Sequence, residues 1–272
     1  MKGSDLPSAR HPERSAEGAQ SKDPSTTDRL RVATYNIHKC RGLDRRTSPA
    51  RIISILQQLD ADILCLQEVV NAPGAALRTG GPSLYDQAGE IERALPAHTA
   101  VFGANRPLHG GTYGNLTLSR LPIRSWHNHD ITSRREARGV LQTDIQLGPH
   151  LIHLFNIHLG TSFPERRRQA RLLLGDRILA NPALTGPRLI LGDLNEWTQG
   201  LTTQLLRNSF RTFRPRHSLQ LPATFPGLLP LLTLDHCYFE PPLELVETHL
   251  FRSRTALIAS DHLPLIADFT LS

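Results

Sequence analysis

The stretch "LILGDLNEW", residues 189–197, decides how this sequence is interpreted. Three aliphatic residues lead through Gly192 to Asp193, and Asn195 follows two positions later. Buried strands commonly end in turn residues, so one Asp or Asn at such a place is ordinary. The stretch is therefore either a turn or the end of a strand that carries functional residues, and the rest of the chain decides between the two.

Composition places the chain among ordinary globular proteins. Its 272 residues can bury a substantial core, and 39% of them are hydrophobic and 21% charged. The net charge of +6 favours phosphate-bearing partners such as nucleic acid or anionic phospholipid. No apolar run approaches the roughly 18 residues of a membrane-spanning helix, and a signal-peptide core is missing. We therefore expect a cytoplasmic protein without a transmembrane segment, and a monomer.

The cysteines point away from disulfides and from thiolate metal sites. There are three, an odd number, and two of them, Cys65 and Cys237, stand in apolar runs. Such residues are typical of reduced cysteines that pack in a core.

The chain divides near residue 30. Residues 1–29 are rich in Ser, Pro and charge and contain one Leu, so they cannot bury enough apolar area to offset ordering. We expect a disordered polar tail there. Because no clear linker follows, residues 30–272 are predicted to form one domain.

Periodicity predicts many strands and few helices. Residues 30–36 alternate as a strand, Ser48 and Pro49 begin a helix that runs to Leu59, and residues 61–70 form a continuous apolar strand. Further strands are predicted at 98–102, 114–119, 138–147, 150–157, 188–193, 232–239, 244–251 and 263–270, and further helices at 84–94 and 162–179. This pattern favours two packed sheets with helices outside them.

Polar residues stand at the end of, or inside, six of these apolar strands. They are Asn36, Glu68, Asn156 with His158, Asp193 with Asn195, Asp235, and Asp261 with His262. Burying such groups without partners is costly, so six occurrences are best explained if the groups converge on one polar site.

The residue types indicate the chemistry of that site. Glu68, Asp261 and Asn36 are hard oxygen donors, which suit Mg²⁺ or Mn²⁺. His158 and His262 can transfer protons near neutral pH. A metal ion, an oriented water and an imidazole in basic surroundings are suited to hydrolysis of a phosphate ester.

The order of these motifs resembles the endonuclease/exonuclease/phosphatase superfamily over residues 30–272. The superfamily includes deoxyribonuclease I-like nucleases, exonuclease III-type repair enzymes, inositol polyphosphate 5-phosphatases and neutral sphingomyelinases. The matching motifs are "TYNIHK" (34–39), "LQEV" (66–69), "YGNLTLSR" (113–120), "NIHLG" (156–160), "GDLNEW" (192–197), "LDHCYF" (234–239) and "SDHLPLIADF" (260–269). The resemblance implies an α/β fold, a four-layer α/β/β/α sandwich with two central mixed β-sheets flanked by helices.

The resemblance also implies roles for the metal-binding and water-binding residues. Glu68, with Asn36 and Asp261, is expected to hold the divalent metal. Asp193 is expected to position or deprotonate the attacking water, and Asn195 to hold the phosphate. "GDLN" is thus interpreted as the working end of a strand.

Further roles concern the phosphate. His262, paired with Asp235, is expected to contact the scissile phosphate, and His158 to bind phosphate or protonate the leaving oxygen. The segment "EARGVL" (136–141) adds Glu136 and Arg138 as candidate substrate-binding residues, and Asn156 is a third.

The predicted function is a divalent-metal-dependent phosphoesterase that cleaves a phosphodiester of nucleic acid or of a phospholipid headgroup by in-line attack of water. "NIHLG" matches the branches with His at this place better than the exonuclease III type, and the chain resembles small bacterial stand-alone members. The alternatives are a phosphomonoesterase on a small molecule such as an inositol phosphate, a catalytically silent binding member of the fold, and a zinc hydrolase, for which no HExxH spacing exists.

Two basic clusters complete the analysis. "RRRQAR" (166–171) is typical of a solvated helix face, and "RTFRPRH" (211–217) mixes Arg with Phe213 in a way that can bind nucleic acid or an anionic headgroup.

Overall fold

The computed structural model describes residues 29–73, 86–133, 136–197, 200–213 and 223–271. Residues 1–28 of the predicted tail lie outside these residues, as do residues 214–217 of the basic cluster at 211–217, whereas Arg29 already belongs to the first strand.

Two mixed β-sheets lie face to face in the described chain. One contains β1 (Arg29–Asn36), β2 (Ile63–Asn71), β3 (Thr99–Leu108), β4 (Gly111–Ser119), β11 (Leu243–Leu250) and β12 (Leu265–Leu271). The other contains β5 (Ile123–Asp130), β6 (Gly139–Leu147), β7 (His150–His158), β8 (Arg188–Asp193), β9 (Arg211–Thr212) and β10 (Asp235–Phe239). Their strand orders are β11–β12–β1–β2–β4–β3 and β5–β6–β7–β8–β10–β9.

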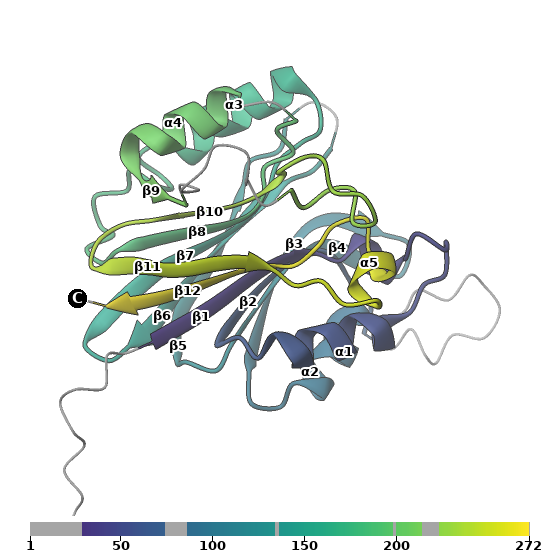
Figure 1. Ribbon diagram of the computed structural model, residues 1–272. Coiled ribbons are helices and arrows are strands. Elements are labelled where there is room, and N and C mark those ends of the chain that lie inside the picture. Colours follow the sequence, from purple (N-terminus) through teal and green to yellow (C-terminus); the bar gives the residue numbers. More distant parts are fainter. Residues whose placement is uncertain (1–28, 74–85, 134–135, 198–199, 214–222, 272) are drawn as a thin grey trace, which may run out of the picture.

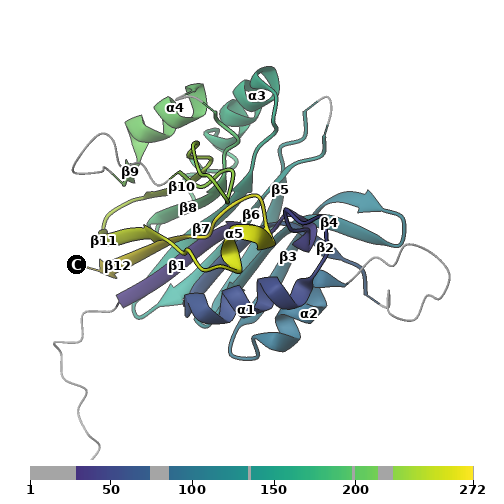
Figure 2. The same cartoon turned by 45° about the vertical axis from the view of Figure 1, so that its right-hand side comes forward.

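Helices cover the two outer faces. They are α1 (Pro49–Leu59), α2 (Gln87–Ala94), α3 (Phe163–Leu173) and α4 (Leu201–Ser209), with a short α5 (Ala256–Ala259) and a one-turn 3-10 element η1 (His38–Cys40) in connections. Helices α1 and α2 lie against the first sheet, and α3 and α4 against the second (Figure 1). They stay on opposite sides when the view is turned (Figure 2). The predicted four-layer α/β/β/α sandwich is confirmed.

Three apolar layers hold the sandwich together. The layer between the sheets contains Val32, Cys65, Leu154 and Phe269 among others, and the two outer layers seat the helices. Burial of this apolar area is the main favourable contribution to folding. Cys65 and Cys237 are free and buried, as predicted.

Several elements differ from the sequence prediction. Helix α3 ends at Leu173, six residues before the predicted end, where turns around Gly175 replace it. Strand β5 was not predicted because it is an edge strand with mostly exposed side chains, which leaves no apolar alternation. Helix α4 was not predicted either, and Glu196 stabilises its start by accepting hydrogen bonds from the backbone N–H groups of Thr202 and Thr203.

Strand direction explains why polar strand ends meet. Strands β1 and β2 pair in parallel, and so do β7 and β8. Their carboxyl ends therefore carry Asn36 and Glu68 in one sheet and His158 and Asp193 in the other. Every helix within the described residues is too short or too polar to cross a membrane.

Candidate functional site

Asp193 lies at the centre of a buried polar cluster that both sheets supply. Asn36, from the first sheet, donates a hydrogen bond from Nδ2 to Asp193 Oδ2 at 3.0 Å. The same oxygen lies 3.6 Å from Nε2 of His158 and 3.6 Å from Nε2 of His262. Burial, and then the negative charge of Asp235, raise the pKa of Asp193 above its usual range, although His262 opposes the rise.

The backbone around Asp193 is shaped for this position. Gly192 has φ +143°, and a Cβ there would lie 1.9 Å from the carbonyl oxygen of Ile157, so only glycine fits between the strands. Asn195 has φ 51° and donates its backbone N–H to Asp193 Oδ1 at 2.8 Å. Its side-chain Nδ2 donates to the carbonyl of Leu159 at 3.0 Å. These contacts fix the carboxylate and the Asn195 side chain beside it.

His262 and Asp235 form a buried pair next to Asp193. Nδ1 of His262 lies 2.8 Å from Asp235 Oδ2, and Asp235 stands directly opposite Asp193 in the β8–β10 register. Burial lowers the pKa of His262, but the charges of Asp235 and Asp193 outweigh it and raise the pKa to about 10. His262 is therefore an imidazolium cation at neutral pH.

His158 is in the opposite state. Nη1 of Arg138 lies 2.7 Å from Nδ1 and 3.0 Å from Nε2 of His158, and Nη2 of Arg138 donates to Glu136 at 2.7 Å. Burial and then the Arg138 charge lower the pKa of His158 well below its usual value. His158 is thus neutral at pH 7, a state that suits binding better than proton donation.

An irregularity in strand β2 sets the direction of the Glu68 side chain. The β2–β4 register shifts between Leu66 and Val69, and Glu68 has φ 60°. Bulges of this kind redirect a side chain and occur next to active sites, and positive φ on a non-glycine residue is strained. Burial raises the pKa of Glu68, but nearby positive charge, that of His158 when protonated and that of Lys39, outweighs burial and lowers the pKa. Since His158 is neutral, the ammonium of Lys39, 2.7 Å from Glu68 Oε2, is the lasting positive charge there.

Asp261 lies at the more open side of the cluster. Its Oδ1 lies 3.3 Å from Ser260 Oγ and 3.4 Å from Nδ1 of His38. Ser260 Oγ donates its hydrogen to the backbone carbonyl of Asn36 at 2.7 Å, which ties the Asp261–His262 segment to the end of β1. Asp261 is thus linked to Asn36 through Ser260 and lies beside His38, whose neighbour Lys39 contacts Glu68. The metal-binding role of Asp261, Asn36 and Glu68 stays a prediction.

Asn156 does not join the cluster. Its Nδ2 donates to the carbonyls of Leu66 and Leu116, and its Oδ1 accepts from Gln67 Nε2 at 2.8 Å. It shares a face with His158 but lies two residues further from the strand end, between the sheets. Asn156 therefore links the two sheets, and its amide is engaged in that link.

Sequence reasoning missed several neighbours of the site. Lys39 and His38 lie in a left-handed turn, with φ 55° and 46°, which turns both side chains back toward Glu68 and Asp261. Tyr113 lies under Lys39, with Nζ 5.5 Å from the ring centre. Thr224 Oγ1 accepts from the Asp235 backbone N–H at 3.3 Å. His38 and Lys39 stand in the quoted motif "TYNIHK", directly after Asn36 and Ile37, whereas Thr224 stands in none of the quoted motifs.

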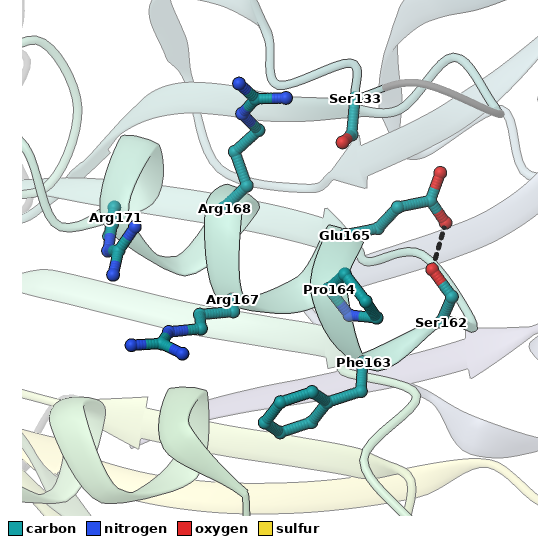
Figure 3. A pocket seen from close by; sticks show the side chains of 8 residues that line it. All are labelled: Ser133, Ser162, Phe163, Pro164, Glu165, Arg167, Arg168 and Arg171. Atoms are coloured by element: carbon teal, nitrogen blue, oxygen red, sulfur yellow. Dashed lines mark hydrogen bonds between the residues drawn. The ribbon is translucent and has the colours of Figure 1, made fainter.

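A basic pocket runs along the start of α3, which begins five residues after His158. Its volume is about 780 Å³, and its lining includes Phe163, Arg167, Arg168 and Arg171, with Ser133 from the β5–β6 connection (Figure 3). Arg168 extends toward the Ser133 side, whereas Arg167 and Phe163 point the other way (Figure 3). Three arginines of the 166–171 cluster thus border an anion-compatible hollow.

A second group of possible metal ligands lies on β11 and β12. Ligand atoms of Glu247, His249 and Asp268 lie within 4.8 Å of one another. Asp268 already receives two hydrogen bonds from Arg31, at 2.7 and 3.1 Å. This cationic partner explains the position of Asp268 without a metal.

Comparison with known proteins gives the family. Residues 33–262 match the Endonuclease/Exonuclease/phosphatase family, and the chain belongs to that family. It is 31% identical over 251 residues to the uncharacterized protein YbhP of Escherichia coli (strain K12), an alignment that covers 89% of this chain and 96% of YbhP. The resemblance seen in the sequence is confirmed.

Solved structures share the fold. An endonuclease/exonuclease/phosphatase from Beutenbergia cavernae superposes with a TM-score of 0.72 at 22% identity, covering 90% of this chain and 72% of that chain. A mannosyl-6-phosphatase from Bacteroides thetaiotaomicron gives 0.67 at 15% identity, with 89% and 100% covered. A humanized D. rerio TDP2 gives 0.66 at 14% identity, with 89% and 99% covered.

Proposed function

We propose that this protein is a divalent-metal-dependent phosphodiesterase that hydrolyses its substrate by in-line attack of a water held at Asp193. Family membership supports phosphate-ester hydrolysis in general. The observation that carries the proposal is the buried cluster in which Asp193 faces a cationic imidazole, His262, and a neutral one, His158.

Asp193 is the group that orients and deprotonates the water. A general base works best when its pKa lies near the operating pH, and burial moves the pKa of Asp193 in that direction. Asn36 and the Asn195 backbone N–H hold the carboxylate in place. Rotation of the Asp193 carboxylate is thus already restricted before the reaction, so that less entropy is lost when it orients the water.

His262 stabilises the charge that develops on the phosphate. As a cation fixed by Asp235, it offers a preorganised N–H donor from Nε2 in a water-poor site. Arg138 adds a second positive charge beside His158, and both fit a phosphate-binding role. Of the two roles predicted for His158, phosphate binding suits its neutral state.

The residues at the first-sheet edge fit Mg²⁺ or Mn²⁺. Glu68 is kept ionised by the ammonium of Lys39, which lowers its pKa against the effect of burial, and Asn36 and Asp261 add further oxygen donors of the kind these ions prefer. A cation bound there would neutralise phosphate oxygens and polarise the phosphorus. Lys39 neighbours that position through its contact with Glu68.

The test is hydrolysis of bis(p-nitrophenyl) phosphate by the purified chain with Mg²⁺, with Mn²⁺ and with EDTA. We expect turnover only with metal, and a thermal transition that rises when Mg²⁺ is added to wild type but not to Glu68→Ala. His127→Ala is the matched control, because His127 lies on the exposed edge strand β5. Equal turnover in EDTA would refute the metal dependence, and absence of turnover on every phosphodiester would refute the proposal.

A parallel panel separates substrates. Duplex DNA, inositol phosphates and vesicular phospholipid are offered under the same conditions. Cleavage of a nucleic acid should weaken steeply with salt as counterions are released, whereas cleavage of a small phosphomonoester should not.

A further inference from the structure

An exposed apolar loop stands beside the candidate site. Residues 225–232, "FPGLLPLL", form a short hairpin closed by backbone hydrogen bonds between Phe225 and Leu232, and we call this segment the leucine loop. Leu228, Leu229 and Leu231 are 65%, 67% and 72% exposed. Single exposed apolar residues are common on proteins, but three large ones at one tip are not.

The leucine loop is attached directly to the Asp261–His262 segment. The backbone N–H of Gly227 donates to the Asp261 carbonyl at 2.7 Å, and the N–H of Leu263 donates to the Thr224 carbonyl at 2.9 Å. The Phe225 ring lies 5.2 Å from the His262 ring, centre to centre. The apolar tip is therefore held in a fixed relation to the candidate catalytic imidazole.

Trp197, which follows β8, extends this apolar rim. It follows the "GDLNE" strand end, is 59% exposed, and its ring lies 6.4 Å from that of Phe225. Tryptophan at such a place is typical of residues that sit at a boundary between water and an apolar phase. The apolar rim therefore consists of Trp197, after β8, and of the leucine loop, which is hydrogen-bonded to Asp261.

The composition of the leucine loop favours a lipid surface over a protein groove or a nucleic acid. Residues 225–232 carry no charge and no polar side chain, so they offer nothing to a phosphate backbone. Two prolines, Pro226 and Pro230, restrict the loop before any contact is made, which lowers the entropic cost of binding. A tip that projects its leucines into solvent suits insertion between lipid headgroups.

Charge supports the same partner. The chain carries a net charge of +6, and Arg167, Arg168 and Arg171 line the pocket along α3. Basic residues add attraction to an anionic lipid surface, and an apolar segment adds insertion.

We propose that the leucine loop and Trp197 dock the protein on an anionic lipid surface, and that the substrate is the phosphodiester of a lipid headgroup presented there. This inference rests on the phosphodiesterase function proposed above. In the reaction, water adds its oxygen to phosphorus, the bond from phosphorus to the leaving alcohol oxygen breaks, and the water's proton passes to that oxygen. The products are a phosphomonoester and an alcohol.

The experiment compares the full wild-type chain with the triple variant L228S/L229S/L231S and with Val246→Ser. Val246 is the matched control because it is 60% exposed on β11 and belongs to no candidate site. Three quantities are measured with Mg²⁺: cosedimentation with vesicles of phosphatidylcholine with and without phosphatidylglycerol, hydrolysis of the vesicle lipids, and hydrolysis of bis(p-nitrophenyl) phosphate in solution.

We expect the triple variant to lose at least about tenfold in binding to anionic vesicles and in lipid hydrolysis, with solution turnover unchanged. Val246→Ser should match wild type in all three. If the triple variant binds and cleaves vesicle lipid like wild type while both hydrolyse the soluble diester, the inference is wrong and the proposed function stands.

Other outcomes overturn the inference in favour of another partner or function. Cleavage of duplex DNA without vesicle binding would assign nucleic acid as the substrate. A wild-type dimer in sedimentation that the triple substitution dissociates, without vesicle binding, would assign the leucine loop to a second copy. Absence of hydrolysis of every diester would remove the proposed function together with the lipid substrate.

Discussion

Two Asp–His pairs border the second sheet, and they differ in what surrounds them. Asp235 and His262 lie 2.8 Å apart at the strand ends, and Asp144 and His153 lie 2.7 Å apart between β6 and β7. Distance alone does not separate them. From the sequence alone, either Asp–His pair could be taken for a catalytic pair.

The difference lies in the remaining polar atoms. Asp144 also accepts from Ser125 and Gln142, and Nε2 of His153 accepts from the backbone N–H of Gly186 at 3.3 Å. In the other pair, Nε2 of His262 points to Asp193 at 3.6 Å, beyond a good hydrogen bond. Within the described residues Asp235 Oδ1 is buried without a partner. An Asp–His pair whose polar atoms all have hydrogen-bond partners supports the structure. A pair that keeps a polar atom without a partner can interact with a substrate.

The largest effect on turnover is expected when the imidazole of His262 is removed. His262→Ala should lower phosphodiester turnover by about 10²–10³-fold, the usual effect of removing one preorganised donor that stabilises developing charge. His153→Ala is the counterpart and should leave turnover within about twofold while it lowers the thermal transition. Steady-state kinetics and thermal denaturation of both variants check this contrast. Equal losses of turnover would remove the distinction between the pairs.

The carboxylate at the bulge comes next. Glu68→Gln removes the charge but keeps the shape, so turnover at saturating Mg²⁺ should fall by about 10²-fold, which corresponds to about 3 kcal/mol of lost charge stabilisation. The Mg²⁺ concentration for half-maximal rate should rise in the same variant. Titration with Mg²⁺ measures both. An unchanged requirement for Mg²⁺ would show that Glu68 is not a ligand.

Asp235 should act through the protonation of His262. With its pKa raised to about 10, folded His262 stays protonated above its ordinary value near 6.5, so its stabilising contribution is complete below about pH 6.5 and disappears as pH rises through about 10. In Asp235→Asn the alkaline limb of the pH–rate profile should move to lower pH. NMR titration of the His262 ring follows the same shift. A profile that keeps its alkaline limb would contradict the role of Asp235.

The smallest effect is expected at the closed pair. Burial raises the pKa of Asp144, but hydrogen bonds from His153, Gln142 and Ser125 outweigh it and lower the pKa. A depressed pKa stabilises the fold above the unfolded value near 3.9, and that stability is lost as pH falls through the folded pKa. Asp144→Asn should therefore weaken the acid dependence of denaturant unfolding and cost about 1–3 kcal/mol at neutral pH. Turnover should remain at the wild-type level.

Much of the site was predictable because strand ends are visible in a sequence. Asp193, His158 and Asn36 follow apolar runs, and parallel pairing brings such ends to one edge. The protonation states of His158 and His262 were not predictable, because Arg138, just before β6, and Asp235, on β10, reach them from distant parts of the sequence. Each of these contacts depends on tertiary structure alone.

The fold shows the same division. The buried strands were found from their apolar runs, but β5 was missed because it is largely exposed and combines Trp126 with His127 and other polar residues, without apolar alternation. The interpretation of Asn156 as a substrate-binding residue depended on its position two residues before His158, and alternation along a strand cannot tell how deep a side chain lies. The left-handed turn at His38 and Lys39 has no local sequence signal such as glycine.

The buried amide of Asn156 has a consequence for the alignment of the two halves of the molecule. With Gln67 and Asn115 it fastens the sheets at fixed points, because Asn115 Nδ2 also donates to the carbonyls of Gly139 and Asn156. An apolar interface by itself is non-directional and tolerates small sliding. These hydrogen bonds fix the position of one sheet relative to the other, so that the edge bearing Asn36 stays opposite the edge bearing Asp193 whenever the chain is folded.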